Sequence, residues 1–197
     1  MNVAAIVLAA GRGARFDATR GKLLEDFAGR PLARYAVEAA LGSTASRTVV
    51  VTGHARDEIE LALAGLPVAF AYNPDFTSGM ASSLRAGLAH AADSAGALML
   101  LADMPDVRSA TLDQLIAAFI RAPDSAAVAP VYQGRRGNPV LLARRLFPRL
   151  ALLNGDEGAR RVLGSIEGVL ELAVDDESVL ADIDTREDLE RALGARS

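Results

Sequence analysis

Short apolar runs separated by segments of helical pattern are the feature of this sequence that most restricts its fold. The apolar runs are residues 3–8, 48–51, 68–72, 97–101 and 126–129. Most of them lack polar alternation, which is typical of parallel strands covered on both faces. Helical patterns lie between them, over residues 31–41, 57–64, 82–92 and 111–120. The alternation predicts an α/β fold, a doubly wound sandwich with a mostly parallel sheet.

The bulk composition narrows the classes of function. A chain of 197 residues with 51% hydrophobic residues can bury the core of one domain. A net charge of −4 without a long basic tract argues against nucleic acid as a partner. The chain has no cysteine, which excludes disulfides and thiolate metal sites. The first apolar run is too short to span a bilayer and no basic segment precedes it. We therefore expect a soluble, cytoplasmic protein with no membrane partner.

Helix caps and one irregular region complete the prediction of the fold. Thr185 can cap a final helix, with Asp188 at its third position. Ser109 or Thr111 is expected to cap the fourth helical segment. Residues 131–172 are less regular, because glycines, asparagines and charges cluster there. We expect this region to form a substrate lobe over an edge of the sheet.

Glycines and arginines follow the first predicted strand directly, in the sequence LAAGRGARF. Backbone N–H groups of such a loop can form a nest for phosphate oxygens, and Gly11 and Gly13 allow positive φ and close approach. Arg12, Arg15 and, further on, Lys22 add cations suited to phosphate. The spacing matches neither the P-loop nor the dinucleotide fingerprint. On spacing alone, a phosphate site and a glycine turn with solvated arginines are equal alternatives.

Two acidic segments could hold a hard cation such as Mg²⁺. Asp103 ends the apolar run in LLADMP, and ligands gather at strand ends in open α/β sheets. Asp182 and Asp184 flank Ile183 and share a face if the segment is extended, so one of them could complete a site with Asp103. Helix capping is the alternative for each segment. Helix capping is the weaker interpretation for Asp103, because Pro105 lies between it and the next helix. On spacing alone, capping is the favoured interpretation for Asp182 and Asp184.

A loop and a helix start follow the third apolar run, in NPDFTSGMASSL at residues 73–84. Ser82 and Ser83 lie near the predicted helix N-terminus, which offers hydroxyl and N–H groups to an anion. A capped helix explains these serines about as well. It does not explain a loop of this length with Gly79 and Met80 at its apex.

Other polar segments give weaker signals. RRGNPV at residues 135–140 and GDEGAR at residues 155–160 join glycine to arginine, so they could hold a second phosphate, although surface loops look similar. His54 and His90 are the only histidines and are isolated from each other. We assign neither of them a catalytic role.

Six motifs occur in the order found in a known family. They are LAAGRGARF with its downstream lysine, NPDFTSGMASSL, LADMP, YQGRRGNPVLL, GDEGAR and DIDTREDL. Together they resemble the MobA-like nucleotidyltransferases, and within them the molybdenum cofactor cytidylyltransferase branch. The resemblance implies a Rossmann-like three-layer sandwich of the nucleotide-diphospho-sugar transferase type. It makes residues 1–197 a single nucleotidyltransferase domain, with residues 131–172 as a small acceptor-binding region.

The resemblance also implies roles for particular residues. Arg15, Lys22 and Asp103 would be catalytic, and Asp103 and Asp184 would hold Mg²⁺. The nucleotide would contact Leu8, Ala9, Ala10, Gly11, Arg12, Gly13, Lys22, Thr52, Asn73, Ser78, Gly79, Ser82, Ser83 and Ala102. The acceptor would contact Arg136, Gly137, Asn138, Pro139, Asp156 and Gly158.

The implied reaction moves CMP from CTP to the terminal phosphate of molybdenum cofactor (molybdopterin) and releases pyrophosphate. Ala10 favours CTP, because the guanylyl branch usually has glycine at this position. Arg20 is a rival to Lys22 as the phosphate cation, because the spacer from Arg15 to Lys22 is longer than the commoner version. Asn138 stands where the branch often has histidine. A molybdoenzyme or its chaperone would receive the product.

Two alternatives remain open. One is an enzyme of the same fold that acts on another phosphorylated acceptor, such as a sugar phosphate or another cofactor. The other is a non-catalytic nucleotide-binding accessory protein. The presence of Lys22, Asp103 and Asp184 together argues against the second, because a pure binder does not need the pair of acids.

Overall fold

The computed structural model describes residues 1–13, 16, 21–155, 163–164 and 166–196. Its main sheet has the strand order β10-β7-β9-β6-β1-β4-β5, with β8 paired to β7. The central strand β1 (Val3–Ala9) pairs in parallel with β4 (Arg47–Thr52) and β6 (Gly96–Leu101). Strand β5 (Ala69–Tyr72) extends the parallel part beyond β4. The carboxyl ends of four neighbouring strands therefore meet at one edge of the sheet.

The other half of the sheet mixes strand directions. Strand β9 (Val140–Ala143) is antiparallel and lies between β6 and β7 (Ala127–Tyr132). Strand β10 (Val169–Ala173) is parallel to β7, and β8 (Arg135–Arg136) forms a hairpin with β7. Strands β8, β9 and most of β10 thus come from the region that we expected to be irregular. Strand β9 was not predicted, because its apolar run is short and directly follows a segment rich in glycine and arginine.

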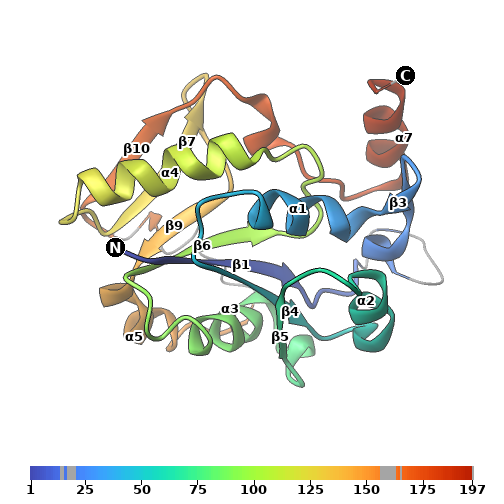
Figure 1. Cartoon of the computed structure of the whole chain (residues 1–197), viewed down its shortest axis with the longest axis horizontal. Helices are drawn as coiled ribbons and strands as arrows, with labels where there is room; N and C mark the ends of the chain where they lie inside the picture. The colour runs from blue at the N-terminus through green and yellow to red at the C-terminus, as the bar shows by residue number, and fades with distance from the viewer. Residues whose placement is uncertain (14–15, 17–20, 156–162, 165, 197) are drawn as a thin grey trace.

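Helices cover both faces of the sheet (Figure 1). The helices α1 (Leu32–Leu41), α2 (Arg56–Ala62) and α4 (Ser109–Arg121) contribute to one core. The helices α3 (Met80–Ala89) and α5 (Phe147–Leu150) pack on the other face. Alternate residues of β1 enter the two cores, as Ala5 does on one face and Ile6 on the other. The predicted three-layer α/β sandwich with a mostly parallel sheet is confirmed.

The C-terminal helix α7 (Arg186–Gly194) covers a third apolar cluster with the hairpin of β2 (Asp26–Phe27) and β3 (Arg30–Pro31). Thr185 and Asp188 form the predicted capping box, with Thr185 accepting from the N–H of Asp188 and Asp188 from that of Thr185. Short 3₁₀ turns complete the fold at Lys22–Leu24, Phe76–Ser78, Arg144–Leu146 and Glu177–Leu180.

Two predictions about helices are wrong in detail. Helix α3 begins at Met80, earlier than expected, because Gly79 with φ of +104° turns the chain into the helix. Helix α4 has no side-chain cap from either proposed residue. The hydroxyl of Ser109 donates to the carbonyl of Ala39 at 2.8 Å, and that of Thr111 bonds Asp176. Both hydroxyl groups therefore bond residues outside α4 and do not cap the helix.

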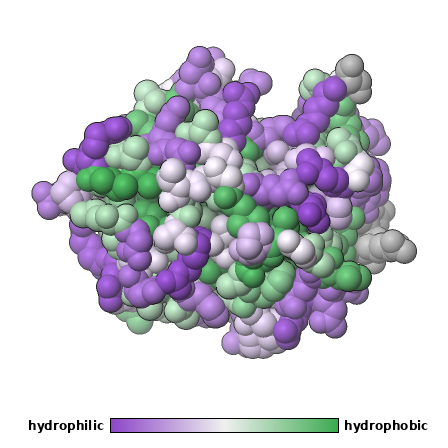
Figure 2. Space-filling model, viewed as in Figure 1, coloured by the Kyte–Doolittle hydropathy of each residue, from purple (hydrophilic) through white to green (hydrophobic). Residues whose placement is uncertain are grey.

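No helix in the described part of the chain is both long and apolar enough to cross a membrane. In the view of Figure 1, hydrophilic residues occupy most of the molecular outline, and hydrophobic residues form smaller patches between them (Figure 2).

Candidate active site at the ends of the parallel strands

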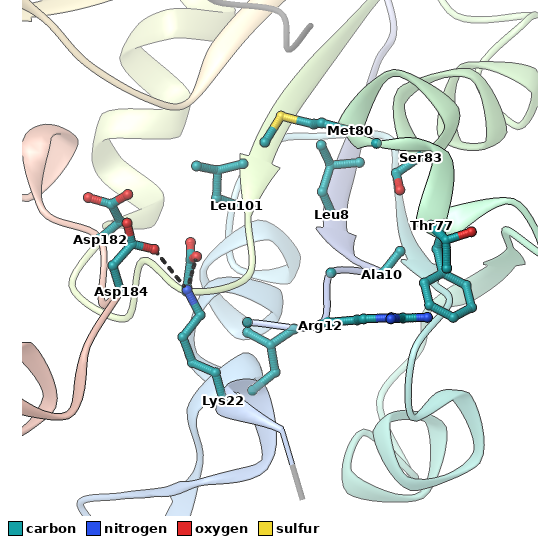
Figure 3. A pocket seen from close by; sticks show the side chains of 16 residues that line it. Leu8, Ala10, Arg12, Lys22, Thr77, Met80, Ser83, Leu101, Asp182 and Asp184 are labelled. Atoms are coloured by element: carbon teal, nitrogen blue, oxygen red, sulfur yellow. Dashed lines mark hydrogen bonds and ion pairs between the residues drawn. The ribbon is translucent and has the colours of Figure 1, made fainter. Parts of the chain in front are cut away.

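A cleft of about 560 Å³ opens beyond the carboxyl ends of β1 and β6. Its described lining comes from five segments, within residues 8–13, 22–23, 76–83, 101–103 and 182–184 (Figure 3). Ligands bind at this edge of open α/β sheets. The volume lies in the range of small-molecule sites, roughly 300–1,000 Å³. The fold thus gathers the glycine loop and both acidic segments around one cleft.

The ammonium of Lys22 joins the two acidic segments (Figure 3). Its Nζ lies 2.7 Å from Oδ2 of Asp103 and 3.2 Å from Oδ1 of Asp184. The side chain of Lys22 is only 8% exposed and that of Asp103 19%, whereas the side chain of Asp184 is 40% exposed, so the pair with Asp103 is the better shielded from water. Three residues that the sequence singled out separately therefore meet within ion-pair distance.

One backbone hydrogen bond brings the second acidic segment to the cleft. The N–H of Ile183 donates to the carbonyl of Asp103 at 3.0 Å. The side chain of Ile183 is buried in the third apolar cluster, whereas Asp182 and Asp184 on either side of it line the cleft. This is the alternation expected of an extended segment.

The acidic end of the cleft has an excess of negative charge. Oδ1 of Asp103 is buried and has no hydrogen-bond partner among the described residues. The pKa of Asp182 is raised, first by desolvation and then by the carboxylates of Asp103 and Asp184. Within the described residues, no three acidic or histidine side chains form a group that could enclose a metal ion. The donor set fits an ion such as Mg²⁺, which takes one or two carboxylates and completes its shell with water and substrate phosphates.

The glycine loop lies directly beside Lys22. Gly13 has φ of +60°, and a Cβ built on it would lie 2.9 Å from Cβ of Lys22. Both the positive φ and the lack of space for a Cβ therefore require glycine at position 13. Gly11 does not have positive φ, so that part of the expectation is wrong, but the space next to its Cα is open. Ala10 is buried, and its carbonyl accepts from the N–H of His54 at 3.1 Å.

Arg12 lies on the wall opposite the acids, extended toward Thr77 (Figure 3). Its guanidinium is 5.5 Å from the ring centroid of Phe76, within cation–π range. The structure thus places Arg12 at the mouth of the cleft, apart from Lys22. Arg15 and Arg20, the other predicted cations of this loop, lie outside the described residues.

A buried amide network holds the wall formed by α3. Nδ2 of Asn73 donates to Oγ of Ser82 at 2.8 Å and to Oγ of Ser83 at 3.0 Å. Oδ1 of Asn73 accepts from the N–H of Asp75 at 3.0 Å. These bonds fasten the loop after β5 to α3. Ser83 and Gly79 line the cleft, whereas Asn73 and Ser82 lie behind its surface.

Residues 136–139, which we predicted to contact the acceptor, lie away from the described cleft. The N–H of Gly137 donates to the carbonyl of Pro130 at 2.9 Å, and that of Asn138 to the carbonyl of Val179 at 2.8 Å. A Cβ on Gly137 would lie 2.2 Å from the oxygen of Val179. Close backbone packing alone therefore requires glycine at this position.

The remaining predicted residues divide into two groups. Those outside the described cleft are Ala9, Thr52, Ser78, Ala102 and Arg136, the last of which pairs with Glu171. Those outside the described residues are Arg15, Asp156 and Gly158.

Several residues that line the cleft had no role of their own in our predictions. They are Leu23, Phe76, Thr77, Met80 and Leu101. Asp182, which we considered as an alternative to Asp184 because both share a face, also lines the cleft. Phe76 and Thr77 belong to a loop whose sequence has no hydrophobic periodicity, so the positions of their side chains could not be predicted.

Comparisons with known proteins agree with this geometry. Residues 5–169 match the family described as MobA-like NTP transferase domain. The crystal structure of Rv0371c from Mycobacterium tuberculosis H37Rv is 29% identical, with a TM-score of 0.87, over 98% of this chain and 97% of that one. A structure of Rv0371c in complex with manganese is 27% identical, with a TM-score of 0.84, over 99% of this chain and 100% of that one.

The bifunctional protein GlmU of Sorangium cellulosum (strain So ce56) is 40% identical over 128 residues. The match covers 61% of this chain and 27% of GlmU. The chain therefore spans about a quarter of the length of the curated relatives that it matches.

Proposed function

Because the chain belongs to the MobA-like NTP transferase domain family, we propose that it transfers CMP from CTP to the terminal phosphate of molybdenum cofactor and releases pyrophosphate. Family membership supports nucleotidyl transfer in general. The choice of base and acceptor rests on the motifs that resemble the cytidylyltransferase branch. The product would pass to a molybdoenzyme or its chaperone.

One observation carries the proposal: Lys22, Asp103 and Asp184 meet at the strand edge, beside the glycine loop. Attack on a nucleotide requires that the charge of its phosphates be neutralised and that the reacting groups be aligned. A lysine and a cation-binding acid pair supply the first requirement. The backbone of residues 11–13 supplies a surface along which a triphosphate can lie.

A divalent cation is part of this proposal. Asp103 and Asp184 would hold it, and it would polarise the α-phosphate and offset its negative charge. The structure of the relative Rv0371c in complex with manganese supports a divalent ion as part of the proposal. Mg²⁺ is the ion that we propose for this chain, because carboxylates and phosphate oxygens are its usual ligands.

The proposed reaction is an in-line displacement at phosphorus. An oxygen of the acceptor's terminal phosphate forms a bond to the α-phosphorus of CTP. The bond between that phosphorus and the bridging oxygen breaks, and its electron pair leaves with pyrophosphate. A phosphate nucleophile is ionised at neutral pH, so no general base is needed.

The residues of the chain have separate roles in this scheme. Lys22 takes up negative charge that develops on the leaving pyrophosphate, and Arg12 offers a second cation at the mouth. Residues 8–13 and Ser83 face the nucleotide. Ala10 lines the cleft, and in this proposal its methyl group favours a pyrimidine over a purine. The acceptor would contact the region 131–172 outside residues 136–139, whose backbone packs against Pro130 and Val179.

A pyrophosphate-release assay tests the function. CTP, GTP, ATP and UTP are each supplied with Mg²⁺ and with molybdenum cofactor or a panel of sugar phosphates. We expect release with CTP and molybdenum cofactor only. Release with a sugar phosphate instead would assign another acceptor. No release with any nucleotide, although CTP binds in calorimetry, would make the protein a non-catalytic binder.

A further inference from the structure

The ammonium of Lys22 cannot contact the phosphates of a nucleotide and the acid pair Asp103 and Asp184 from one position. In the proposed function it neutralises phosphates, yet here its Nζ contacts Oδ2 of Asp103 and Oδ1 of Asp184, at 2.7 and 3.2 Å. The same two carboxylates would hold the divalent cation. An ion bound to both oxygens would stand beside the ammonium, and like charges in a partly buried site repel strongly.

The charges around the cleft explain why the ammonium of Lys22 contacts these acids. Three carboxylates, of Asp103, Asp182 and Asp184, line this end of the cleft. Among the cations of the described lining, Lys22 pairs with Asp103 and Asp184, whereas Arg12 stacks on Phe76. Removal of the ammonium would make this end of the cleft more negative, which favours the binding of another cation.

The residue type at position 22 suits a cation that changes partners. Lys22 is the only lysine among the 21 basic residues of the chain. Its charge is compact and sits on a flexible four-carbon stem, whereas the planar fork of arginine is better suited to a fixed carboxylate partner. The aliphatic part of the Lys22 side chain lies against Gly13. A change of rotamer would therefore bring its ammonium to a phosphate bound along the glycine loop.

We propose that Lys22 is a resident cation of the acid pair and exchanges places with the divalent ion when a triphosphate enters the cleft. The ammonium turns to the phosphates, and the divalent ion takes the carboxylates. The metal therefore binds together with the nucleotide rather than before it. By linkage, the phosphate chain strengthens metal binding, and the metal strengthens phosphate binding by the same factor. The inference rests on the proposed function only in that a triphosphate occupies this cleft, whatever its base.

Metal binding to the nucleotide-free protein tests the first half of the exchange. Mn²⁺ is titrated into the wild type, Lys22→Met and Lys22→Arg, and free Mn²⁺ is measured by electron paramagnetic resonance. Lys22→Met keeps the stem without the charge, and it should bind Mn²⁺ about 10-fold tighter than the wild type or more. Lys22→Arg keeps the charge and should bind no tighter than the wild type. Equal affinity in the wild type and Lys22→Met would overturn the proposal.

The wild-type lysine tests the second half and does not depend on how a variant folds. Protein labelled with ¹³C-lysine gives the signal of a single residue, since Lys22 is the only lysine. Inorganic tripolyphosphate should shift the Cε resonance, whereas Mg²⁺ alone, at the concentration that saturates Lys22→Met, should not. A shift with Mg²⁺ alone, or none with bound tripolyphosphate, would overturn the exchange. Absence of pyrophosphate release would reject the proposed function but leave these binding results unchanged.

Discussion

The N–H of Ile183 donates to the carbonyl of Asp103 across 3.0 Å, and this bond sets the register between the C-terminal segment and the end of β6. Because the segment is extended there, Ile183 faces the core while Asp182 and Asp184 face the cleft. The acid pair is thus assembled by backbone pairing. Its position depends on the fold rather than on the flexible ends of its side chains.

Replacing Lys22 should affect turnover more than replacing Arg20. Lys22 contacts the acid pair and lines the cleft, so Lys22→Ala removes a cation from the place where charge develops. We expect its kcat/KM for pyrophosphate release to fall on the order of 10²–10³-fold, as for other lost charge-stabilising donors. Arg20→Ala should lose much less. The reverse order would transfer the phosphate role to Arg20.

Substitution of Gly137 should reduce stability rather than acceptor binding. A Cβ at this position would lie 2.2 Å from the oxygen of Val179, so the backbone must shift. Gly137→Ala should lower the free energy of unfolding by about 1–3 kcal/mol, as overpacking does, in urea titrations. The matched control is Gly194→Ala, since nothing lies within 4 Å of that position and no loss is expected there. Normal stability with weakened acceptor binding would instead assign Gly137 to the acceptor site.

The cap of α7 should give a pH-dependent contribution to stability. Hydrogen bonds from the side chain and then the backbone of Thr185 hold the pKa of Asp188 below its ordinary value. The stabilisation is therefore present above the unfolded-state pKa, about 3.9, and is lost as pH falls through the lower folded-state pKa.

Two variants measure this cap. Thr185→Ala should lower the free energy of unfolding by about 1 kcal/mol at neutral pH. Asp188→Asn should destabilise at about pH 7 and much less at about pH 2, below the range where the carboxylate ionises. An equal difference at both values would mean that the charge of Asp188 contributes nothing to the cap.

Sequence patterns predicted the parts of this fold that have a strong local signal. Buried parallel strands such as β1 and β6 are continuous apolar runs, and the capping box at Thr185 is set by residues three apart. Strand β9 was missed because its antiparallel insertion between β6 and β7 depends on long-range pairing. The cap of α4 failed for a similar reason, since Ser109 bonds the distant carbonyl of Ala39.

The candidate site was predictable to a different extent. Motifs at strand ends predicted Gly13 and Asp103, because strand ends are where α/β sheets bind ligands. The role of Asp184 was implied only by the family resemblance, since spacing alone favoured a helix cap. Motif matching could not distinguish lining residues from those behind them. Asn73, for example, is buried in a network with Ser82 and Ser83, a contact that only the packing of α3 reveals.

Ala10 should influence the choice of base. Its methyl group is buried at the wall of the cleft, where we propose that the cytosine lies. Ala10→Gly should lower the ratio of kcat/KM for CTP over GTP by about 10-fold, the discrimination typical of one methyl group. The ratio is measured by pyrophosphate release with each nucleotide in parallel. An unchanged ratio would place the determinant of base choice elsewhere.

Pyrophosphate release by Asp103→Asn tests the central claim most directly. Asparagine keeps the shape of the side chain but removes the charge that pairs with Lys22 and would hold the cation. The variant and the wild type are assayed with CTP, Mg²⁺ and molybdenum cofactor, after thermal unfolding has shown that both are folded. The account predicts release by the wild type and a loss on the order of 10²-fold or more in the variant. Near-normal turnover by a folded Asp103→Asn protein would contradict it.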